Sequence, residues 1–482
     1  MSEEFAANFN QNYCKNYESK THWEKHRWVY IFVFLEALVI LFYGLFTAYD
    51  VESNAFNAKT NGTNAEHTVN NYYPIFQDIH VMMFIGFGFL YAYLRTYSWT
   101  SVGINYLLGA WSIQISILLY GFWTAVLTNS WNSKIMLNIT SLIHADFAAG
   151  TVLISFGGVL GKFNMAQYMI MATIEIIFYS LNNMIGVYIF KAVDLGGSMF
   201  IHTFGAYFGL GVTYFASSLN AFNHKNNSSN YLSNLIGMIG TIFLWMYWPS
   251  FNCAISAGNA RHRTIFNTIM SLTGSCLTVF IIGPIFRKGR FSMEAVLNAT
   301  VAGGVVIGAS ADLILTPWAS IIIGIGAGFL SLLGFEVIGP FLSRTIGLHD
   351  TAGIHNLHGM TGVLGGIISA IVAGTATQAN YGDSLLLLFP MMDQRTNSVQ
   401  AGYQLATLGV TIGIALVSGI ITGLILNLKC LNAPNLLFSD RFLWDFEGIS
   451  LDDGCENVKV SETPDRNELM DLKTEKNKMN ID

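Results

Sequence analysis

Apolar and polar residues follow one another along this chain in long blocks, and the apolar blocks have the length of membrane-spanning helices. A span needs about 20 mostly apolar residues. Twelve segments meet that need: 28–49, 76–96, 101–127, 135–161, 165–191, 197–218, 233–256, 264–286, 293–313, 317–339, 357–377 and 401–428. Because a backbone in hydrocarbon must satisfy its own hydrogen bonds, such runs are predicted to be helical. The expected fold class is an all-α polytopic membrane protein with twelve transmembrane helices.

Composition supports this interpretation and excludes several classes of function. Only 11% of the residues are charged and 52% are apolar, whereas a soluble domain carries about 25% charged residues. The net charge of −6 and the lack of a basic run give no support for nucleic-acid binding. The five cysteines form no CxxC pair, so neither a zinc site nor a disulfide framework is expected. No Walker A motif is present, so no ATP-driven pump is expected. The chain is also not expected to be an enzyme or to hold a metal or a cofactor.

The distribution of basic residues predicts how the chain is oriented. Four basic residues precede the first span, Lys15, Lys20, Lys25 and Arg27, whereas the loop of about 50–75 holds only Lys59. Positive residues favour the cytosolic side, so both termini of a twelve-span chain are expected in the cytosol, with the plasma membrane as the expected location. The sequon that begins at Asn61 then lies in an outer loop, where an N-glycan can be attached.

This orientation divides the chain into three parts. Residues 1–27 are expected to form a cytosolic arm, and residues 28–430 a transmembrane domain. Residues 431–482 are polar and acidic and are expected to form a mobile cytosolic tail.

Two segments in different halves of the chain are alike. In 194–202 and in 350–358, an aspartate opens a span and a histidine follows eight residues later. Eight helical residues rise ~12 Å, which carries each histidine to mid-membrane. The predicted topology runs the two segments in opposite directions, as in an inverted repeat whose halves share a site at the midplane.

Each feature of this repeat also has a structural interpretation. Asp194 and Asp350 are suited to cap helix N-termini, and that role is compatible with a functional site nearby. A lone buried histidine would be interpreted as a structural residue that forms a hydrogen bond between helices. Two histidines at matching positions, His202 and His358, favour a pore, because ionisable residues inside a membrane usually face a cavity.

The chemistry of such a pair indicates what the pore passes. A neutral imidazole offers one donor and one acceptor, so two facing rings share one hydrogen bond and point their other nitrogens along the pore. This arrangement suits a small polar solute. It suits a bare cation poorly, because burying an ion costs several kcal/mol. A TVGYG-like carbonyl filter is also missing from the sequence, which disfavours potassium.

The same residues resemble the ammonium transporter superfamily (Amt, Mep and Rh), and in particular its Rh glycoprotein branch, over residues 28–430. Six separated motifs carry the resemblance: Phe76-Gln-Asp-Ile-His80-Val, Ala145-Asp-Phe147, Met199-Phe-Ile-His202-Thr-Phe-Gly-Ala-Tyr-Phe-Gly-Leu210, Leu244-Trp-Met-Tyr-Trp-Pro-Ser-Phe251-Asn, Asn298-Ala-Thr-Val-Ala-Gly-Gly304 and Asn356-Leu-His358-Gly.

The resemblance implies a fold and a set of site residues. The fold is an inverted 5+5 repeat with an extra N-terminal helix and an added C-terminal helix, assembled as a homotrimer. His202 and His358 fall on the twin histidines of the family, and Phe147 and Phe251 on the phenylalanines that gate the pore. By residue type alone both phenylalanines are ordinary core aromatics. Asp194 and Asp350 fall on the paired aspartates, and Asn61 on a loop that many Rh glycoproteins glycosylate.

Departures from the family pattern leave the histidine pair intact. Asn183 stands where many relatives have Glu near the outer vestibule, and His355 stands where relatives often have Asn. Thr361 replaces a common Pro.

The expected function is passage of neutral ammonia down its gradient, with ammonia or ammonium and the lipid bilayer as partners. Three alternatives stay open: a carbon dioxide channel, a membrane scaffold with a vestigial pore, and a proton-coupled amine carrier. Only the carrier would generate a current during amine transport.

Overall fold

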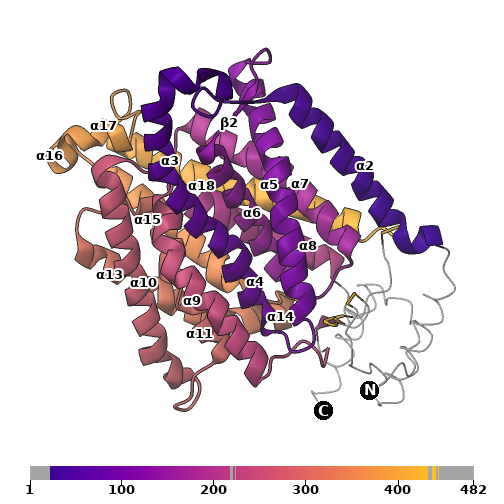
Figure 1. The fold of residues 1–482 in the computed structure, drawn as a ribbon. Helices are drawn as coiled ribbons and strands as arrows, with labels where there is room; N and C mark the ends of the chain where they lie inside the picture. The colour runs from indigo at the N-terminus through magenta and orange to yellow at the C-terminus, as the bar shows by residue number, and fades with distance from the viewer. Residues whose placement is uncertain (1–21, 218–220, 223, 432–436, 441–442, 445–482) are drawn as a thin grey trace, which may run out of the picture.

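A bundle of long helices dominates the structure, a computed structural model that describes residues 22–217, 221–222, 224–431, 437–440 and 443–444. Successive helices alternate in direction across the bundle (Figure 1). The elements up to the first histidine segment are α2 (His22–Phe46), β1 (Thr47–Tyr49), η1 (Ala55–Asn57), α3 (Ala58–Val81), η2 (Met82–Gly86), α4 (Phe87–Leu90), η3 (Tyr91–Tyr93), α5 (Ser98–Thr128), β2 (Ile135–Leu137), α6 (Ile139–Val159), α7 (Met165–Met184) and η4 (Ile185–Phe190).

The remaining elements carry both histidine segments. They are η5 (Ser198–Thr203), α8 (Phe204–Ala216), α9 (Tyr231–Cys253), α10 (Gly258–Phe286), α11 (Met293–Ala299), α12 (Ala302–Ile307), η7 (Gly308–Ser310), α13 (Pro317–Leu333), η8 (Gly334–Ile338), α14 (Gly339–Ile346), η9 (His355–Gly359), α15 (Met360–Thr375), α16 (Gln378–Tyr381), η10 (Gly382–Ser384), α17 (Leu385–Leu388) and α18 (Asn397–Leu426).

Ten helices of the described residues are long and apolar enough to cross a membrane, which makes the chain an integral multi-pass membrane protein. Two of the twelve expected spans are not among the ten. They form the helices Ser198–Ala216 and Tyr231–Cys253. The expected loop of about 50–75 is also shorter than predicted, because α3 already begins at Ala58. The side chain of Asn61 lies outside the described set, so its glycosylation stays a prediction.

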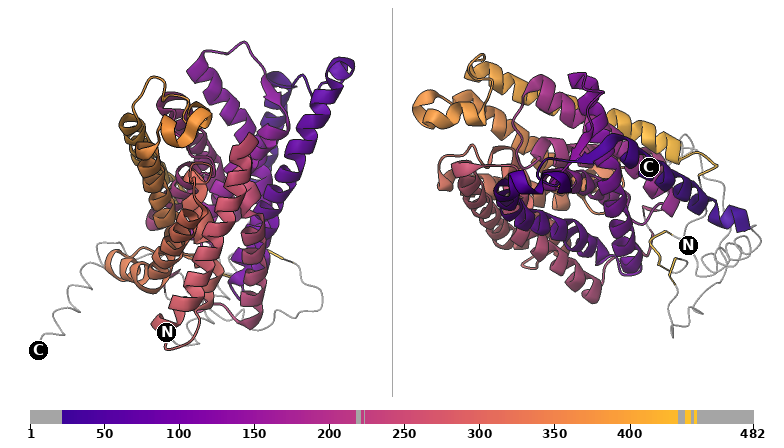
Figure 2. Two further views of the ribbon diagram at one scale, coloured as in Figure 1. Left: turned by 90° about the vertical axis from the view of Figure 1, so that its left-hand side faces the viewer. Right: turned by 45° about the horizontal axis from the view of Figure 1, so that its top comes forward.

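The first helix, α2, lies at the edge of the bundle and tilts away from it (Figures 1 and 2). In the most apolar stretch of its membrane span, Trp28–Phe46, only 6% of the residues are buried against the rest of the protein. Its end continues into β1, which pairs in parallel with β2 in the register Thr47↔Ile135. These two short strands tie the end of α2 to the segment that precedes α6.

Small residues allow the helices of the bundle to approach closely. A Cβ added to Gly324 on α13 would lie 2.0 Å from the carbonyl oxygen of Ser271 on α10. At Gly419 on α18, an added Cβ would lie 2.3 Å from the carbonyl oxygen of Phe208 on α8. Backbone-to-backbone seams of this kind are typical of membrane bundles, where small residues lie at the interfaces.

The described part of the C-terminal tail packs on the bundle. The backbone N–H of Phe438 donates to the carbonyl oxygen of Gly161 at 2.9 Å. The carboxylate of Asp440 accepts from the backbone N–H groups of Thr100 at 2.7 Å and Trp99 at 3.2 Å, at the start of α5. The three-part division of the chain and the mobility of residues 431–482 stay predictions.

Candidate functional site

Asp194 and Asp350 lie at opposite ends of the bundle. α6 begins beside β2, and only five residues separate its end from the start of α7, so Asp194, which follows α7 and η4, is at the same end as β2. Asp350 follows α14, which Figure 1 places at the other end. These are called the Asp194 end and the Asp350 end below.

Each aspartate caps the short helical segment that carries a histidine. The carboxylate of Asp194 accepts from the backbone N–H groups of Met199 at 2.9 Å and Phe200 at 2.7 Å. Asp350 accepts from Ile354 at 3.0 Å and His355 at 2.9 Å. Such caps satisfy N–H groups that the first helical turn leaves free.

Burial raises the pKa of both capping carboxyl groups, which lie in the connections between spans. For Asp194 the pKa is raised to about 7, and the donated backbone hydrogen bonds oppose this shift. The pKa of Asp350 is raised by burial too, while the same kind of hydrogen bonds and the charge of Lys162 oppose the shift. Each cap therefore works against the cost of burying its own charge.

The two segments are π-helical where they carry the histidines. His202 lies in η5 and His358 in η9, and both segments continue directly into α-helices, α8 and α15. A π-helical turn displaces side chains from the ordinary helical register and is frequent at functional sites. The two turns bring the side chains of His202 and His358 into contact.

The imidazoles of His202 and His358 are buried and in contact. Their Nδ1 atoms lie 3.1 Å apart, the ring centroids are 5.1 Å apart, and the ring planes differ by 12°. At this Nδ1–Nδ1 distance one ring donates its hydrogen and the other accepts it. The Nε2 atom of His202 is buried and has no hydrogen-bond partner among the described residues.

Two further aromatic rings flank the histidine pair. Trp248 on α9 stacks on His202 with ring centroids 5.7 Å apart and planes 27° apart. Phe87 on α4 stacks on His358 at 6.1 Å and 28°. The pair is thus held between rings from two other helices, which fixes the orientation of both imidazoles.

A small cavity of about 10 Å³ lies beside His202. This volume matches about one water-sized molecule. His202 is the sole titratable side chain of the lining, which is otherwise apolar or aromatic and consists of Met82, Met83, Phe87, Gly150, Ile154, Ile201, His202, Leu244, Trp248 and Phe251. The histidine pair and this cavity are called the histidine chamber below.

Phe147 and Phe251 lie on the side of the chamber next to His202. Their ring centroids are 4.9 Å apart in an edge-to-face arrangement, and both residues are buried. The ring centroid of Phe251 lies 5.9 Å from that of His202. The structure therefore brings together four of the predicted site residues, Phe147, Phe251, His202 and His358, whereas Asp194 and Asp350 hold the segments from the two ends.

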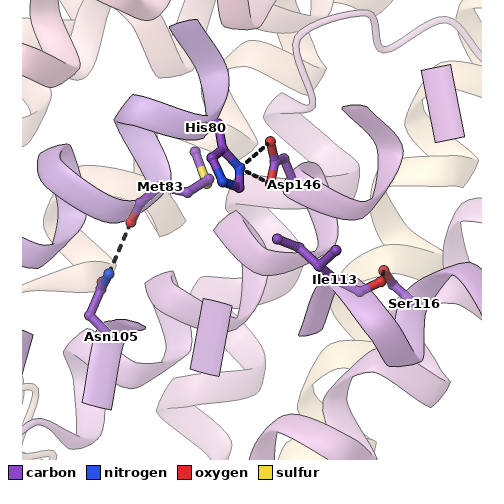
Figure 3. A network of polar contacts seen from close by, with 6 residues as sticks. All are labelled: His80, Met83, Asn105, Ile113, Ser116 and Asp146. Atoms are coloured by element: carbon purple, nitrogen blue, oxygen red, sulfur yellow. Dashed lines mark hydrogen bonds and ion pairs between the residues drawn. The ribbon is translucent and has the colours of Figure 1, made fainter. Parts of the chain in front are cut away.

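A network of polar contacts supports the chamber from α3, α5 and α6 (Figure 3). His80 Nδ1 lies 3.1 Å from each carboxylate oxygen of Asp146, the residue directly before Phe147. Asn105 donates from its side-chain amide to the carbonyl oxygen of Met83 at 3.0 Å. These contacts link the chamber-lining Met83 and the neighbour of Phe147 to adjacent helices.

Sequence reasoning missed several residues of the chamber. Met82, Met83, Phe87 and Trp248 line the cavity, yet none of them was singled out from the sequence. A signal for Trp248 was present, because it precedes Phe251 by three residues and shares its face of the helix. His355 is not part of the pair; its ring lies against Tyr207 at 6.0 Å.

The fold and the buried polar pair define a polytopic helical membrane protein with a candidate site between its helices. Comparison with known proteins gives its family. The model of the Ammonium Transporter Family matches residues 37–435. The chain therefore belongs to the Ammonium Transporter Family.

Individual relatives place the similarity in the Rh branch of that family. An ammonium transporter Rh type B of Takifugu rubripes is 41% identical over 452 residues, which cover 92% of this chain and 94% of the relative. An ammonium transporter Rh type C of Xenopus laevis is 41% identical over 457 residues, or 91% of this chain and 95% of the relative.

Two solved structures have a similar fold. The structure of Nitrosomonas europaea Rh50 has a TM-score of 0.65 and 29% identity, and covers 84% of this chain and 96% of its own. A sensor Amt protein, with a TM-score of 0.60 and 18% identity over 75% of this chain and 93% of its own, supports the fold alone.

Proposed function

We propose that this protein transports ammonium nitrogen across a membrane by conducting neutral ammonia through the histidine chamber. The observation that carries the proposal is the contact between His202 and His358, with Nδ1 atoms 3.1 Å apart beside a water-sized apolar cavity. The named activity of the Rh type B and type C relatives supports ammonium as the transported species.

The proposed passage has four steps. Ammonium gathers at the Asp194 end and gives up its proton before or at Phe147 and Phe251. Neutral ammonia enters the chamber, passes His202 and His358, and regains a proton at the Asp350 end. Only the neutral form crosses, because an apolar lining offers an ion nothing to replace its hydration shell, at a cost of several kcal/mol.

The histidine pair gives ammonia a matched partner in this lining. Ammonia both donates and accepts hydrogen bonds, and the two Nε2 atoms of the pair differ: one bears hydrogen and the other does not. A solute that passes both rings therefore meets an acceptor and a donor in turn. An added proton would place a charge on this coupled, buried pair at a high cost, so the pair is expected to stay neutral.

The architecture is proposed to be an inverted 5+5 repeat with an extra N-terminal and an added C-terminal helix, giving twelve spans. Matched contacts support the inversion. The backbone N–H of Gly196 donates to the carbonyl oxygen of Gly308 at the Asp194 end, and that of Ala352 donates to Gly157 at the Asp350 end. Cytosolic termini, a plasma-membrane location and assembly as a homotrimer belong to the same proposal.

Reconstituted protein tests the proposal directly. Vesicles that contain the wild-type chain are exposed to an ammonia gradient, and internal pH is followed by stopped flow while current is recorded in parallel. Conduction of ammonia predicts a fast pH change without current. A proton-coupled carrier would produce current, and a scaffold would produce neither signal above empty vesicles.

Carbon dioxide is the second candidate solute. Apart from His202 the chamber lining is apolar or aromatic, which also suits an apolar gas. Flux of each gas measured in the same vesicles separates the two. A carbon dioxide channel would keep its flux when the histidines are replaced, because carbon dioxide does not need the donor and acceptor that the pair supplies.

A further inference from the structure

A buried acid that plays no part in the chamber lies between three helices. Glu175 on α7, Ser155 on α6 and Gly205 on α8 meet there, and the side chains of Glu175 and Ser155 are fully buried. Glu175 takes part in neither of the two ion pairs of the described residues. An acid without a cation inside a membrane protein calls for a physical explanation.

Counting hydrogens identifies the protonation state of this acid. Ser155 Oγ carries one hydrogen and lies 2.7 Å from the carbonyl oxygen of Gly205, which only accepts. The same Oγ is in very close contact with Glu175 Oε1. An ionised carboxylate also only accepts, so two acceptors would then compete for one hydrogen and one close contact would hold none.

A neutral carboxylic acid resolves this conflict. Its O–H donates to Ser155 Oγ, and Ser155 in turn donates to the carbonyl oxygen of Gly205, so each contact holds one hydrogen. The other oxygen, Glu175 Oε2, is buried without a hydrogen-bond partner among the described residues. An unpaired carbonyl oxygen is far less costly to bury than an unpaired charge.

The chain of hydrogen bonds is a mechanical link and not a route for protons. It ends on the amide carbonyl of Gly205, which accepts a hydrogen bond but does not pass a proton on. Its middle member, Ser155, and its last member, Gly205, lie next to the chamber in the sequence. Ser155 directly follows Ile154, which lines the cavity, and Gly205 lies three residues after His202.

At this link α6 and α8 are packed too closely to accept an added side-chain atom. A Cβ added to Gly205 would lie 2.7 Å from the carbonyl oxygen of Thr151, and one added to Gly209 would lie 2.8 Å from Cα of Ser155. α6 and α8 are thus in backbone contact where Glu175 reaches in from α7. We therefore expect a change in the hydrogen bonds here to shift α8, and with it the segment that holds His202.

We propose that Glu175 is a permanently protonated carboxylic acid that positions His202 by donating a hydrogen bond to Ser155. Glu175 is a positioning residue, because it acts through Ser155 and the α6–α8 seam and does not touch the chamber lining. Its effect on transport rests on the proposed ammonia conduction, whereas its protonation and its link to Ser155 do not.

Infrared spectroscopy of the full chain tests the protonation. The wild type is compared with Glu175→Gln, and the carbonyl band of a protonated carboxylic acid is expected to be present in the wild type and lost in the variant. An unchanged band in that region, or the loss of an ionised carboxylate band instead, would overturn the proposal.

Function and stability test the positioning role. Glu175→Gln keeps a donor toward Ser155 and is expected to keep wild-type ammonia flux and melting temperature. Glu175→Leu and Ser155→Ala remove the link and are expected to lower flux by about twofold to tenfold, the range that one neutral hydrogen bond is worth. Loss of flux in the Gln variant equal to that in the Leu variant contradicts the role.

The readouts separate this proposal from the proposed function. If the wild type conducts no ammonia, the conduction proposal fails while the infrared band and the stability order of the three variants still test Glu175. If Glu175→Leu does not fold, Ser155→Ala, which deletes one oxygen atom, gives the same comparison.

Discussion

The Nδ1 atoms of His202 and His358 lie 3.1 Å apart, on rings whose planes differ by only 12°. A single hydrogen occupies the space between them, so the state of one ring determines the state of the other. If His202 donates, its Nε2 is an acceptor and that of His358 is a donor, and the reverse arrangement exchanges the two roles. The pair therefore acts as one unit.

This coupling predicts how alanine substitutions combine. His202→Ala and His358→Ala are each expected to reduce ammonia flux strongly, because the surviving imidazole loses its partner and its fixed orientation. The double variant is expected to be little worse than either single variant, with a coupling of about 0.5–3 kcal/mol in a double-mutant cycle on the flux. Stopped-flow measurement of vesicle pH gives the four rates of the cycle, those of the wild type, the two single variants and the double variant.

His355→Ala provides a matched control for that cycle. It removes a histidine three residues away on the same segment that does not contact the pair. Its flux is expected to stay near wild type. Strictly additive effects of the two single substitutions at His202 and His358 would show that the rings act independently.

The edge-to-face contact of Phe147 with Phe251 predicts a size filter. Their centroids are 4.9 Å apart, so removal of either ring opens space on the His202 side of the chamber. Phe147→Ala and Phe251→Ala are expected to raise the flux of methylamine relative to ammonia. The ratio of the two fluxes in the same vesicle preparation measures this.

A buried phenylalanine away from the chamber controls for general loosening of the bundle. Phe208 on α8 is fully buried and is not part of the cavity lining. Phe208→Ala is expected to lower the melting temperature while leaving the flux ratio unchanged. If Phe208→Ala raised the ratio of methylamine flux to ammonia flux equally, the size filter could not be assigned to Phe147 and Phe251.

The cap made by Asp194 predicts that removing its carboxylate lowers the free energy of unfolding. Its carboxylate accepts from two backbone N–H groups, at 2.9 and 2.7 Å, at the start of the segment that carries His202. Asp194→Ala leaves both donors buried without a partner and is expected to cost about 1–3 kcal/mol of unfolding free energy. Asp194→Asn keeps an acceptor oxygen and is expected to recover part of this loss. Thermal unfolding in detergent gives the order, and an alanine variant as stable as wild type would exclude the capping role.

Much of this fold could be predicted because the membrane imposes simple rules on sequence. Long apolar blocks fixed the positions of the helices, and the shared spacing of Asp194 with His202 and of Asp350 with His358 identified the two related segments. The lengths of the polar connections were harder: α3 begins at Ala58, inside a region that hydropathy alone assigns to a loop. The first part of α3 is polar, and a polar stretch of helix is not detected by counting apolar residues.

The details of the chamber depend on tertiary packing and were not predictable. The π-helical turns of η5 and η9 set the direction in which His202 and His358 point, yet no residue type demands such a turn. Trp248 and Phe87 flank the pair from helices far away in sequence. Aromatic residues make up 14% of the chain, so composition cannot distinguish these two from core residues.

The packing of Trp248 predicts the effect of a single added methyl group. A Cβ added to Gly304 would lie 2.5 Å from the Trp248 ring, which itself stacks on His202. Gly304→Ala is therefore expected to displace the indole and reduce ammonia flux. Gly326→Ala is the matched control, because an added Cβ there meets nothing within 4 Å. A flux in Gly304→Ala equal to that in the control would show that the Trp248 stack is not needed.

Lys162 predicts how stability depends on pH. It lies in the short connection between α6 and α7 at the Asp350 end, and its ammonium donates to the carbonyl oxygen of Gly158 at 2.8 Å, to Thr213 Oγ1 at 2.7 Å and to the carbonyl oxygen of His349. Burial lowers the pKa of Lys162 to about 7, although the charge of Asp350 opposes the shift. The folded chain therefore gives up this proton near neutral pH, whereas the unfolded chain holds it up to about pH 10.4.

The sign of the effect follows from proton counting. Between about pH 7 and about pH 10 the unfolded state binds more protons at this position than the folded state, so the contribution of Lys162 to stability rises with pH. Lys162→Met removes that contribution. The melting temperature of the wild type minus that of Lys162→Met is therefore expected to increase across this range and to be flat below it. A difference that falls as pH rises would mean that Lys162 keeps its proton in the folded chain and that its three oxygen partners outweigh the cost of burial.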